Sequence, residues 1–98
     1  MPRAELTLLA QAEQDLIELR RYSRREFGAA TADRYVEDIR GVFRLLCDNP
    51  RAGAPRPDLG ANIRSFTKRR HRILYCMVEQ GIQVVRVLHH SQDARRAL

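Results

Sequence analysis

The sequence predicts an α+β domain in which an antiparallel sheet carries an α-helical hairpin on one face. Two stretches of helix-type apolar periodicity follow each other in the first half of the chain. The second half contains three short runs rich in β-branched and aromatic residues. The expected order is β-α-α-β-β-β, and the 98 residues suffice for one domain with one core, residues 1–98.

The first half of the chain predicts one short strand and two helices. Residues 6–9 form the strand candidate, and a helix is expected from Ala10 to Phe27, with Gly28 as its C-cap. A second helix is expected from about Thr31 to Asp48, where Asn49-Pro50 stops it. The short link makes the two helices an antiparallel hairpin. Their apolar stripes are Ala12, Leu16, Leu19, Tyr22 and Phe27 in the first, and Ala32, Tyr35, Ile39, Val42 or Phe43, and Leu46 in the second.

The second half predicts a loop and an antiparallel meander. Residues 50–60 contain three of the four prolines, which is typical of a loop with restricted backbone freedom. Strands are expected at Ile63–Thr67, Arg72–Val78 and Ile82–His89. A basic turn joins the first two strands, and a Gly-containing loop joins the last two as a β-hairpin.

The last hairpin is apolar on both faces. Residues 73, 75 and 77 are Ile, Tyr and Met, whereas residues 74, 76 and 78 are Leu, Cys and Val. Side chains two positions apart share a face, and a strand apolar on both sides needs a layer on each. The helical hairpin covers one face, and only residues 90–98 remain for the other. We therefore expect part of the second face to be uncovered and to mark a protein interface.

The charge of the chain predicts an anionic partner. The net charge is +6, and 17 of the 18 basic residues are Arg. Arg pairs bidentately with carboxylate and phosphate, so the partner is nucleic acid, a nucleic-acid-processing machine or an acidic protein segment. Direct nucleic-acid binding is disfavoured, because no base-stacking aromatic residues are interleaved with the basic turn at residues 68–72.

Cysteine usage and hydropathy predict a cytoplasmic protein without a metal or cofactor. Cys47 and Cys76 lie in apolar patterns and are expected to be small buried hydrophobic residues. Neither Cys nor His shows the spacing of metal ligands. No apolar run approaches a membrane span, and the first residues lack a signal-type apolar region.

The chain resembles the ParE-type toxins of the RelE/ParE superfamily. The resemblance covers nearly the whole length and is most specific in the string Arg86-Val87-Leu88-His89-His90-Ser91-Gln92-Asp93, since members typically show Arg-x-Leu-His-Gly-x-x-Asp there. His90 stands where Gly is usual. The other matching positions are Ala12, Asp15, Leu16, Tyr22, Asn49-Pro50, Gly53, Leu59-Gly60, Arg64 and Arg72-Ile73-Leu74-Tyr75.

The resemblance implies a toxin of a type II toxin–antitoxin module. Such a toxin inhibits DNA gyrase by trapping the enzyme on cut DNA, without catalysis of its own, and a ParD-like antitoxin neutralises it. We expect this antitoxin to contribute an acidic amphipathic segment. The alternative function is that of the RelE branch, which cleaves mRNA on the ribosome. Candidate contacts with the target or the antitoxin are Arg64, Arg72, Tyr75, Arg86, His89, His90 and Asp93.

Several of these residues also permit other roles. RNA cleavage needs a base, an acid and cations, which the histidines and arginines near the last strand could supply. The single Lys and the lack of a Tyr after Tyr75 argue against it. His89 is expected to hydrogen-bond the loop after its strand, and Asp93 to cap the turn or pair with an Arg. Arg86 lies in a largely apolar strand, so it is either an internal ion pair or an exposed contact.

Overall fold

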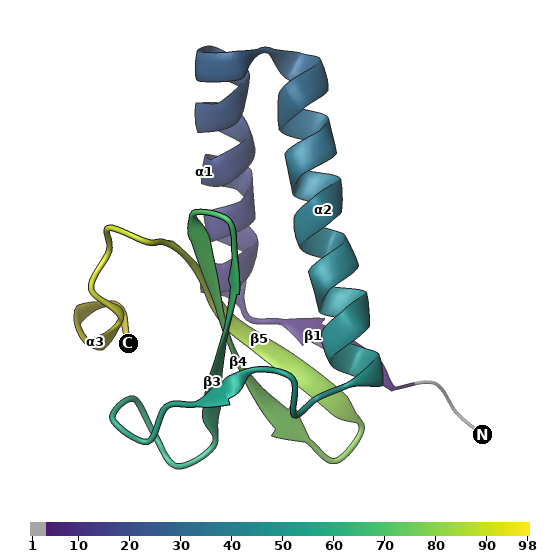
Figure 1. Ribbon diagram of the computed structural model, residues 1–98, viewed down its shortest axis with the longest axis vertical. Coiled ribbons are helices and arrows are strands. Elements are labelled where there is room, and N and C mark those ends of the chain that lie inside the picture. Colours follow the sequence, from purple (N-terminus) through teal and green to yellow (C-terminus); the bar gives the residue numbers. More distant parts are fainter. Residues whose placement is uncertain (1–3) are drawn as a thin grey trace.

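The computed structural model describes residues 4–98 as one layer of sheet with a helical hairpin on one face (Figure 1). The predicted α+β class and the order of the helices and main strands are confirmed. The elements are β1 (Glu5–Leu8), α1 (Ala10–Phe27), α2 (Ala29–Asp48), β2 (Ala54–Pro55), β3 (Ile63–Lys68), β4 (His71–Val78), β5 (Gly81–His89) and α3 (Ala94–Ala97).

The sheet has the strand order β1-β5-β4-β3-β2. The antiparallel meander of β3, β4 and β5 is confirmed. The prediction of a wholly antiparallel sheet is wrong at one edge, because β1 pairs in parallel with β5. Apolar periodicity sets the face of a strand and carries no information about which distant strand pairs with it or in which direction. The two-residue strand β2 lies inside the predicted loop and pairs with β3.

The helical hairpin turns at a single residue. Gly28 has a φ of 87°, a backbone conformation that would be strained in a residue with a side chain. It closes α1 as predicted. Helix α2 therefore begins at Ala29, two residues earlier than expected. Tyr22 and Phe27 were expected in the apolar stripe but are 53% and 61% exposed. The far ends of both helices stand beyond the sheet (Figure 1), so the sheet does not cover the tip of the helical hairpin.

The main core lies between the helical hairpin and the sheet. Val36 joins the predicted residues of α2 in this core, while Tyr35 is only partly buried at its margin. The buried residues are Ala12, Leu16, Leu19, Val36, Ile39, Val42, Phe43, Leu46, Ile73, Tyr75, Ile82, Val84 and Val87. Both cysteines are free and only partly buried, in contrast to the buried positions expected for them.

The second face of the sheet has a small core of its own. Leu74 and Leu88 are fully buried there, beneath Ala94 of α3 and beside Leu59 and Ile63. The chain end forms a short helix whose alanines cover the centre of this face. The part of the face that was expected to be uncovered is therefore not its centre. Val78, which shares this face with Leu74, remains 37% exposed at the end of β4. No helix among residues 4–98 is long and apolar enough to cross a membrane.

Candidate partner-binding surfaces

Arg86 joins three elements rather than facing solvent. Its Nε and Nη2 donate to the two carboxylate oxygens of Asp15 in α1, at 2.8 and 2.9 Å, and its Nη1 donates to the carbonyl of Ala97 at 2.8 Å. The two side chains are only 15% and 11% exposed. Hydrogen bonding to the Asp15 carboxylate raises the pKa of the Arg86 guanidinium. Arg86 was expected either to form an internal ion pair or to be an exposed contact residue, and the structure shows the internal ion pair.

Asp15 also completes the sheet edge. Its Oδ2 accepts the main-chain N–H of Val87 at 2.9 Å. Strand β1 pairs with β5 only as far as Val84, and the β4–β5 register shifts just beyond this point. The carboxylate thus satisfies a backbone donor that β1 does not reach, which buried N–H groups require.

Tyr75 and Arg64 hold the proline-rich loop. The Tyr75 hydroxyl donates to the carbonyl of Pro50 at 2.7 Å and accepts the N–H of Gly53 at 2.8 Å. Arg64 donates to the carbonyl of Gly53 at 2.6 Å. A Cβ at Gly53 would lie 2.6 Å from the Tyr75 hydroxyl, so the loop requires glycine here. Tyr75 is fully buried, which removes it from the candidate surface contacts.

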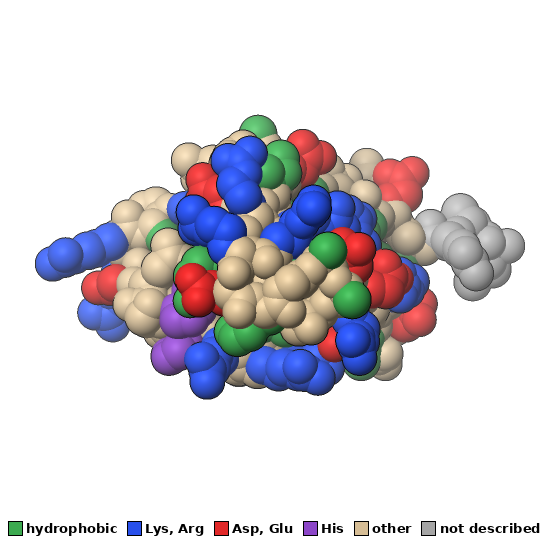
Figure 2. All heavy atoms as spheres, turned by 90° about the horizontal axis from the view of Figure 1, so that it is seen from above, with side chains coloured by type: hydrophobic (Ala, Val, Ile, Leu, Met, Phe, Trp, Pro, Cys, Tyr) green, Lys and Arg blue, Asp and Glu red, His purple; other side chains and the backbone are tan. Residues whose placement is uncertain are grey.

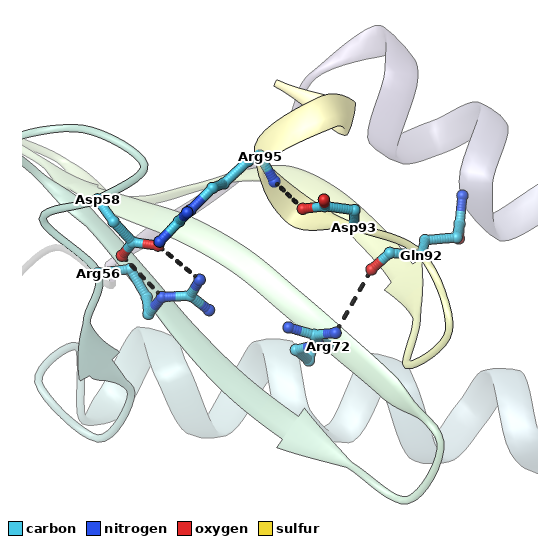
Figure 3. Close-up of polar contacts among 6 residues, drawn as sticks. All are labelled: Arg56, Asp58, Arg72, Gln92, Asp93 and Arg95. Carbon is cyan, nitrogen blue, oxygen red and sulfur yellow. Dashed lines mark hydrogen bonds and ion pairs between the residues drawn. The ribbon is translucent and has the colours of Figure 1, made fainter.

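The chain end is tied down by polar contacts (Figure 3). Arg72 donates to the carbonyl of His90 at 2.9 Å and more weakly to that of Gln92. Asp93 caps α3 by accepting the N–H of Arg95 at 2.9 Å, the capping role expected for it. Asp58 pairs with Arg56 and Arg95, and the hydrogen bond from Arg56 holds the pKa of the Asp58 carboxyl well below its usual range.

Three histidines and a tyrosine lie close together where β4 begins and β5 ends. The hydroxyl of Tyr35 and Nδ1 of His71 lie 2.6 Å apart, and the rings of His71 and His89 meet edge to face at 5.4 Å. The His90 ring follows at 4.3 Å from His89. Burial, followed by the charges of His89 and His90, lowers the pKa of His71 to about 4. His71 is therefore neutral at pH 7, and Tyr35 holds its ring in place.

The sequence did not predict this stack. His71 was expected in a turn, whereas it opens β4 and pairs with His89 across the sheet. His89 contacts the loop after its strand as expected, with its Nδ1 2.7 Å from the Ser91 hydroxyl. The family resemblance led us to expect Gly at the position of His90, yet the only non-Gly residue with positive φ among residues 4–98 is Arg69. The local backbone thus accepts a side chain at His90 without strain.

A groove with a basic rim runs along the helical hairpin. We call it the arginine groove; its volume is about 560 Å³ and its apolar floor includes Leu16 and Val36. Four arginines line it, and one of them, Arg20, has an ion pair at 3.8 Å with the exposed Asp33. Basic side chains gather around the end of the molecule where the helix tips lie (Figure 2). The lining residues are Leu8, Glu13, Leu16, Ile17, Arg20, Arg21, Arg24, Val36 and Arg40.

The groove was not predicted from the sequence. Arginines repeating along one helix are most often a solvated face, so the arginines of residues 20–25 do not by themselves predict a binding groove. The floor comes partly from β1 and α2, which only the packed fold brings beside α1. A second hollow has a volume of about 700 Å³, and Arg51 is the one basic residue that lines it. The lining residues are Leu45, Asn49, Pro50, Arg51, Ala52 and Phe66. Among residues 4–98, no group of three or more His, Cys, Asp or Glu side chains is arranged so that it could hold a metal ion.

Among known proteins, this chain is similar to ParE toxins. A family model described as the ParE toxin of the type II toxin–antitoxin system parDE matches residues 6–94. This chain belongs to the ParE toxin family. It is 29% identical to Toxin ParE1 of Caulobacter vibrioides over 91 residues, which cover 93% of this chain and 94% of that toxin. It is 33% identical to Toxin ParE of Escherichia coli over 91 residues, which cover 88% and 84% of the two chains.

A solved structure has the same ParE fold. The chain from a chromosomal ParDE toxin–antitoxin system of P. aeruginosa superposes with a TM-score of 0.77 at 21% identity. The match covers 89% of this chain and 96% of that one. The resemblance noted in the sequence is thereby confirmed, and the chain is a toxin of the type II toxin–antitoxin class.

Proposed function

We propose that this ParE toxin acts by binding DNA gyrase, and that a ParD-type antitoxin neutralises it by docking an acidic amphipathic helix in the arginine groove. The arginine groove is the observation that carries the antitoxin half of the proposal. Family membership supports the gyrase half. The engagement of the candidate catalytic arginines within the fold supports action without catalysis.

The arginine groove suits a helix with one apolar and one acidic face. Ile17 is 49% exposed at its edge, and a partner's aliphatic side chain would cover it together with Leu16 and Val36. Carboxylates on the flanks of that helix would reach Arg21, Arg24 and Arg40. Exposed ion pairs each contribute only about 0.2–1 kcal/mol, so burial of the floor supplies most of the affinity and the charges supply orientation.

The contacts around the last strand argue for a binder rather than a nuclease. Arg86 is paired with Asp15, and Arg64 donates to loop carbonyls. During RNA cleavage, the reacting phosphate gains negative charge and needs cationic side chains that are free to contact it. Arg64 instead holds the proline-rich loop, and Arg86 holds α1 and the chain end.

The alternative, ribosome-dependent mRNA cleavage, draws on one observation. His89 is partly buried and His90 is exposed, and their stacked rings lie at the end of β5 near the basic turn. An exposed imidazole can move a proton at neutral pH. This candidate predicts cleaved mRNA, which the gyrase proposal does not.

Two assays on one preparation test the target. The purified toxin is added to gyrase with supercoiled plasmid and, separately, to translating ribosomes with a defined mRNA. We expect cleaved plasmid that stays bound to gyrase, intact mRNA, and reversal by antitoxin. Codon-specific mRNA cuts with unaffected gyrase would assign the interferase function instead.

The antitoxin half is tested by stability. A partner that binds only the folded state raises the melting temperature by mass action. We expect the toxin's melting midpoint to rise with antitoxin concentration. An unchanged midpoint at saturating antitoxin would contradict the proposal.

A further inference from the structure

The turn between β3 and β4 presents a cluster of basic side chains. Lys68 ends β3, and Arg69 and Arg70 form the two-residue loop before His71. Both loop residues are exposed. Among residues 4–98, neither Lys68 nor Arg70 has an ion pair, and Arg69 approaches Asp38 only at 3.7 Å. The turn thus offers three positive charges, of which only one has a carboxylate near it.

The backbone of the turn is strained at Arg69. This residue has a φ of 52°. A two-residue hairpin loop with positive φ at its first position ordinarily has Gly there, because Gly adopts this conformation without strain. The chain therefore keeps a basic side chain at the tip of the turn against the local backbone preference. Residues held in such conformations are concentrated at functional sites.

Two neighbouring elements hold the turn in place. On one side, the Arg70 carbonyl accepts the N–H of His90 at 2.7 Å, which ties the turn to the chain end. On the other side, the Tyr35 hydroxyl of α2 lies 2.6 Å from Nδ1 of His71, and the Tyr35 ring lies 5.8 Å from the Arg69 guanidinium. Because its backbone is already fixed, the turn presents its charges with little further cost of ordering on binding.

The chemistry of the turn fits a phosphate backbone better than a protein segment. Residues 68–72 line neither the arginine groove nor the second hollow, so these hollows give the turn no apolar floor. Protein interfaces usually have a buried apolar centre in which an anchor side chain sits. A DNA backbone needs none, because Lys and Arg contact its regularly spaced negative charges at the surface.

The turn has too few charges for a stable complex with free DNA. Affinity for DNA grows with the number of phosphates that are neutralised, and one turn neutralises only a few. The contact becomes significant where another protein already holds the DNA beside the toxin, because the local concentration of phosphate is then high. The turn points toward the same end of the molecule as the tips of α1 and α2, where basic side chains surround the surface (Figures 1 and 2).

We propose that the β3–β4 turn contacts the phosphate backbone of the DNA that gyrase holds. The inference rests on the proposed gyrase function and makes DNA part of the surface that the toxin recognises. Lys68, Arg69 and Arg70 meet the phosphates, and the toxin consequently binds gyrase more tightly when gyrase carries DNA. Exposed charge pairs each contribute little, so the three together strengthen binding about fivefold to thirtyfold.

Fluorescence anisotropy of labelled toxin tests the proposal with gyrase alone and with gyrase preloaded with a linear DNA duplex. The turn variant, Lys68→Glu with Arg70→Glu, leaves Arg69 and its backbone conformation in place. We expect DNA to raise the affinity of the wild type about fivefold to thirtyfold and that of the turn variant less than about twofold. The affinities of both proteins for gyrase alone should be similar. The gain of the wild type should shrink as salt rises.

A control variant separates the turn from the net charge of the chain. Arg51→Glu with Arg96→Glu changes the net charge by the same amount at two exposed positions outside the turn. This variant should keep the gain that DNA gives the wild type. Equal losses in the two double variants would trace the gain to overall charge and overturn the proposal.

The other outcomes distinguish the DNA contact from the gyrase function. A wild-type affinity that DNA does not change overturns the DNA contact and leaves binding to gyrase standing. A gain that the folded turn variant retains also overturns it, because the contact then lies elsewhere. Failure to bind gyrase in either state contradicts the proposed function and the DNA contact together. If the turn variant does not fold, as judged by its melting temperature, Arg70→Gln alone decides, and it should reduce the gain about twofold to threefold.

Discussion

Asp15 in α1 and Arg86 in β5 form a two-point ion pair, with N–O distances of 2.8 and 2.9 Å. The same carboxylate accepts the N–H of Val87, and the same guanidinium donates to the chain end at Ala97. One pair of side chains thus fastens a helix and the C-terminal turn to the strand between them. It also explains why Arg stands in an otherwise apolar strand: its charge is balanced inside the fold.

Asp15→Asn should destabilise the fold by roughly 2–4 kcal/mol. The substitution keeps the shape of the side chain but leaves Arg86 partly buried without a counter-charge, and removing one member of a buried pair typically costs about 3–5 kcal/mol. Denaturant unfolding measures the difference. Glu18→Gln, an exposed change of the same kind one turn along α1, is the control and should alter stability by less than about 0.5 kcal/mol. A similarly small effect at Asp15 would mean that solvent already screens the pair.

The stability of the toxin should fall as the pH is lowered from about 6.5 toward 4. His71 has a pKa of about 4 in the fold, against an ordinary value of 6.5. Between these values the unfolded chain binds a proton that the folded chain does not, so acid favours unfolding; the contribution is complete above 6.5, and no further loss from this group occurs below 4. Because the ring is partly exposed, the effect is roughly 1–2 kcal/mol.

Chemical unfolding across this pH range, with His71→Gln as comparison, checks the assignment to His71. The variant should show a flatter stability profile than the wild type between pH 4 and 6.5. His90→Gln is the matched control at an exposed position of the same stack. Parallel profiles for wild type and His71→Gln would place the titrating group elsewhere.

Charge reversal in the arginine groove should weaken antitoxin binding. Arg21→Glu with Arg24→Glu replaces two attractions with two repulsions, and we expect about a 10- to 100-fold loss of affinity. The wild-type association rate should fall as salt rises, and that of the double variant should depend less on salt.

A control variant separates the groove from the net charge of the chain. Arg34 is exposed on α2 but does not line the groove. Arg34→Glu with Arg51→Glu changes the net charge equally and should leave most of the affinity intact. Equal losses in both double variants would show that the antitoxin responds to overall charge and not to this groove.

The sequence predicted the fold to the extent that local patterns determine it. The helical stripes, Gly28 and the β-branched runs specify their own elements, because each pattern depends on neighbours within a few residues. The parallel pairing of β1 with β5 joins residues about 76 positions apart, for example Glu5 with Gly81. Such pairing depends on how the whole chain packs, and no short pattern encodes it.

The candidate site was harder to predict, for a related reason. The string from Arg86 to Asp93 is the clearest sequence feature, yet Arg86 and Asp93 hold the fold together. Internal polar contacts constrain residue identity as strongly as a binding site does. The arginine groove depends on which faces are left uncovered after folding, and a solvated arginine face looks the same in sequence whether or not an apolar floor lies beside it.

His89→Ala and His90→Ala separate the two candidate functions of the toxin. If an imidazole moves a proton during RNA cleavage, one of these changes should reduce the cleavage rate by about 10²–10⁴-fold, the usual contribution of a positioned acid or base. If the toxin acts by binding gyrase, no step needs proton transfer, and each change removes only a packing or surface contact. We expect the second result, with toxicity retained by both variants.

The readout is growth arrest on induction in a bacterium, with the melting temperature of each purified variant as the check on folding. His89 packs between His71 and His90, so His89→Ala should lower stability, whereas the exposed His90 should tolerate Ala with little change. His90→Ala is therefore the cleaner of the two variants. Our proposal would be contradicted if the wild type cleaved mRNA on ribosomes and left gyrase unaffected, and if a folded His90→Ala variant had lost both this cleavage and toxicity. That result would assign the imidazole a chemical role and the toxin to the interferase branch.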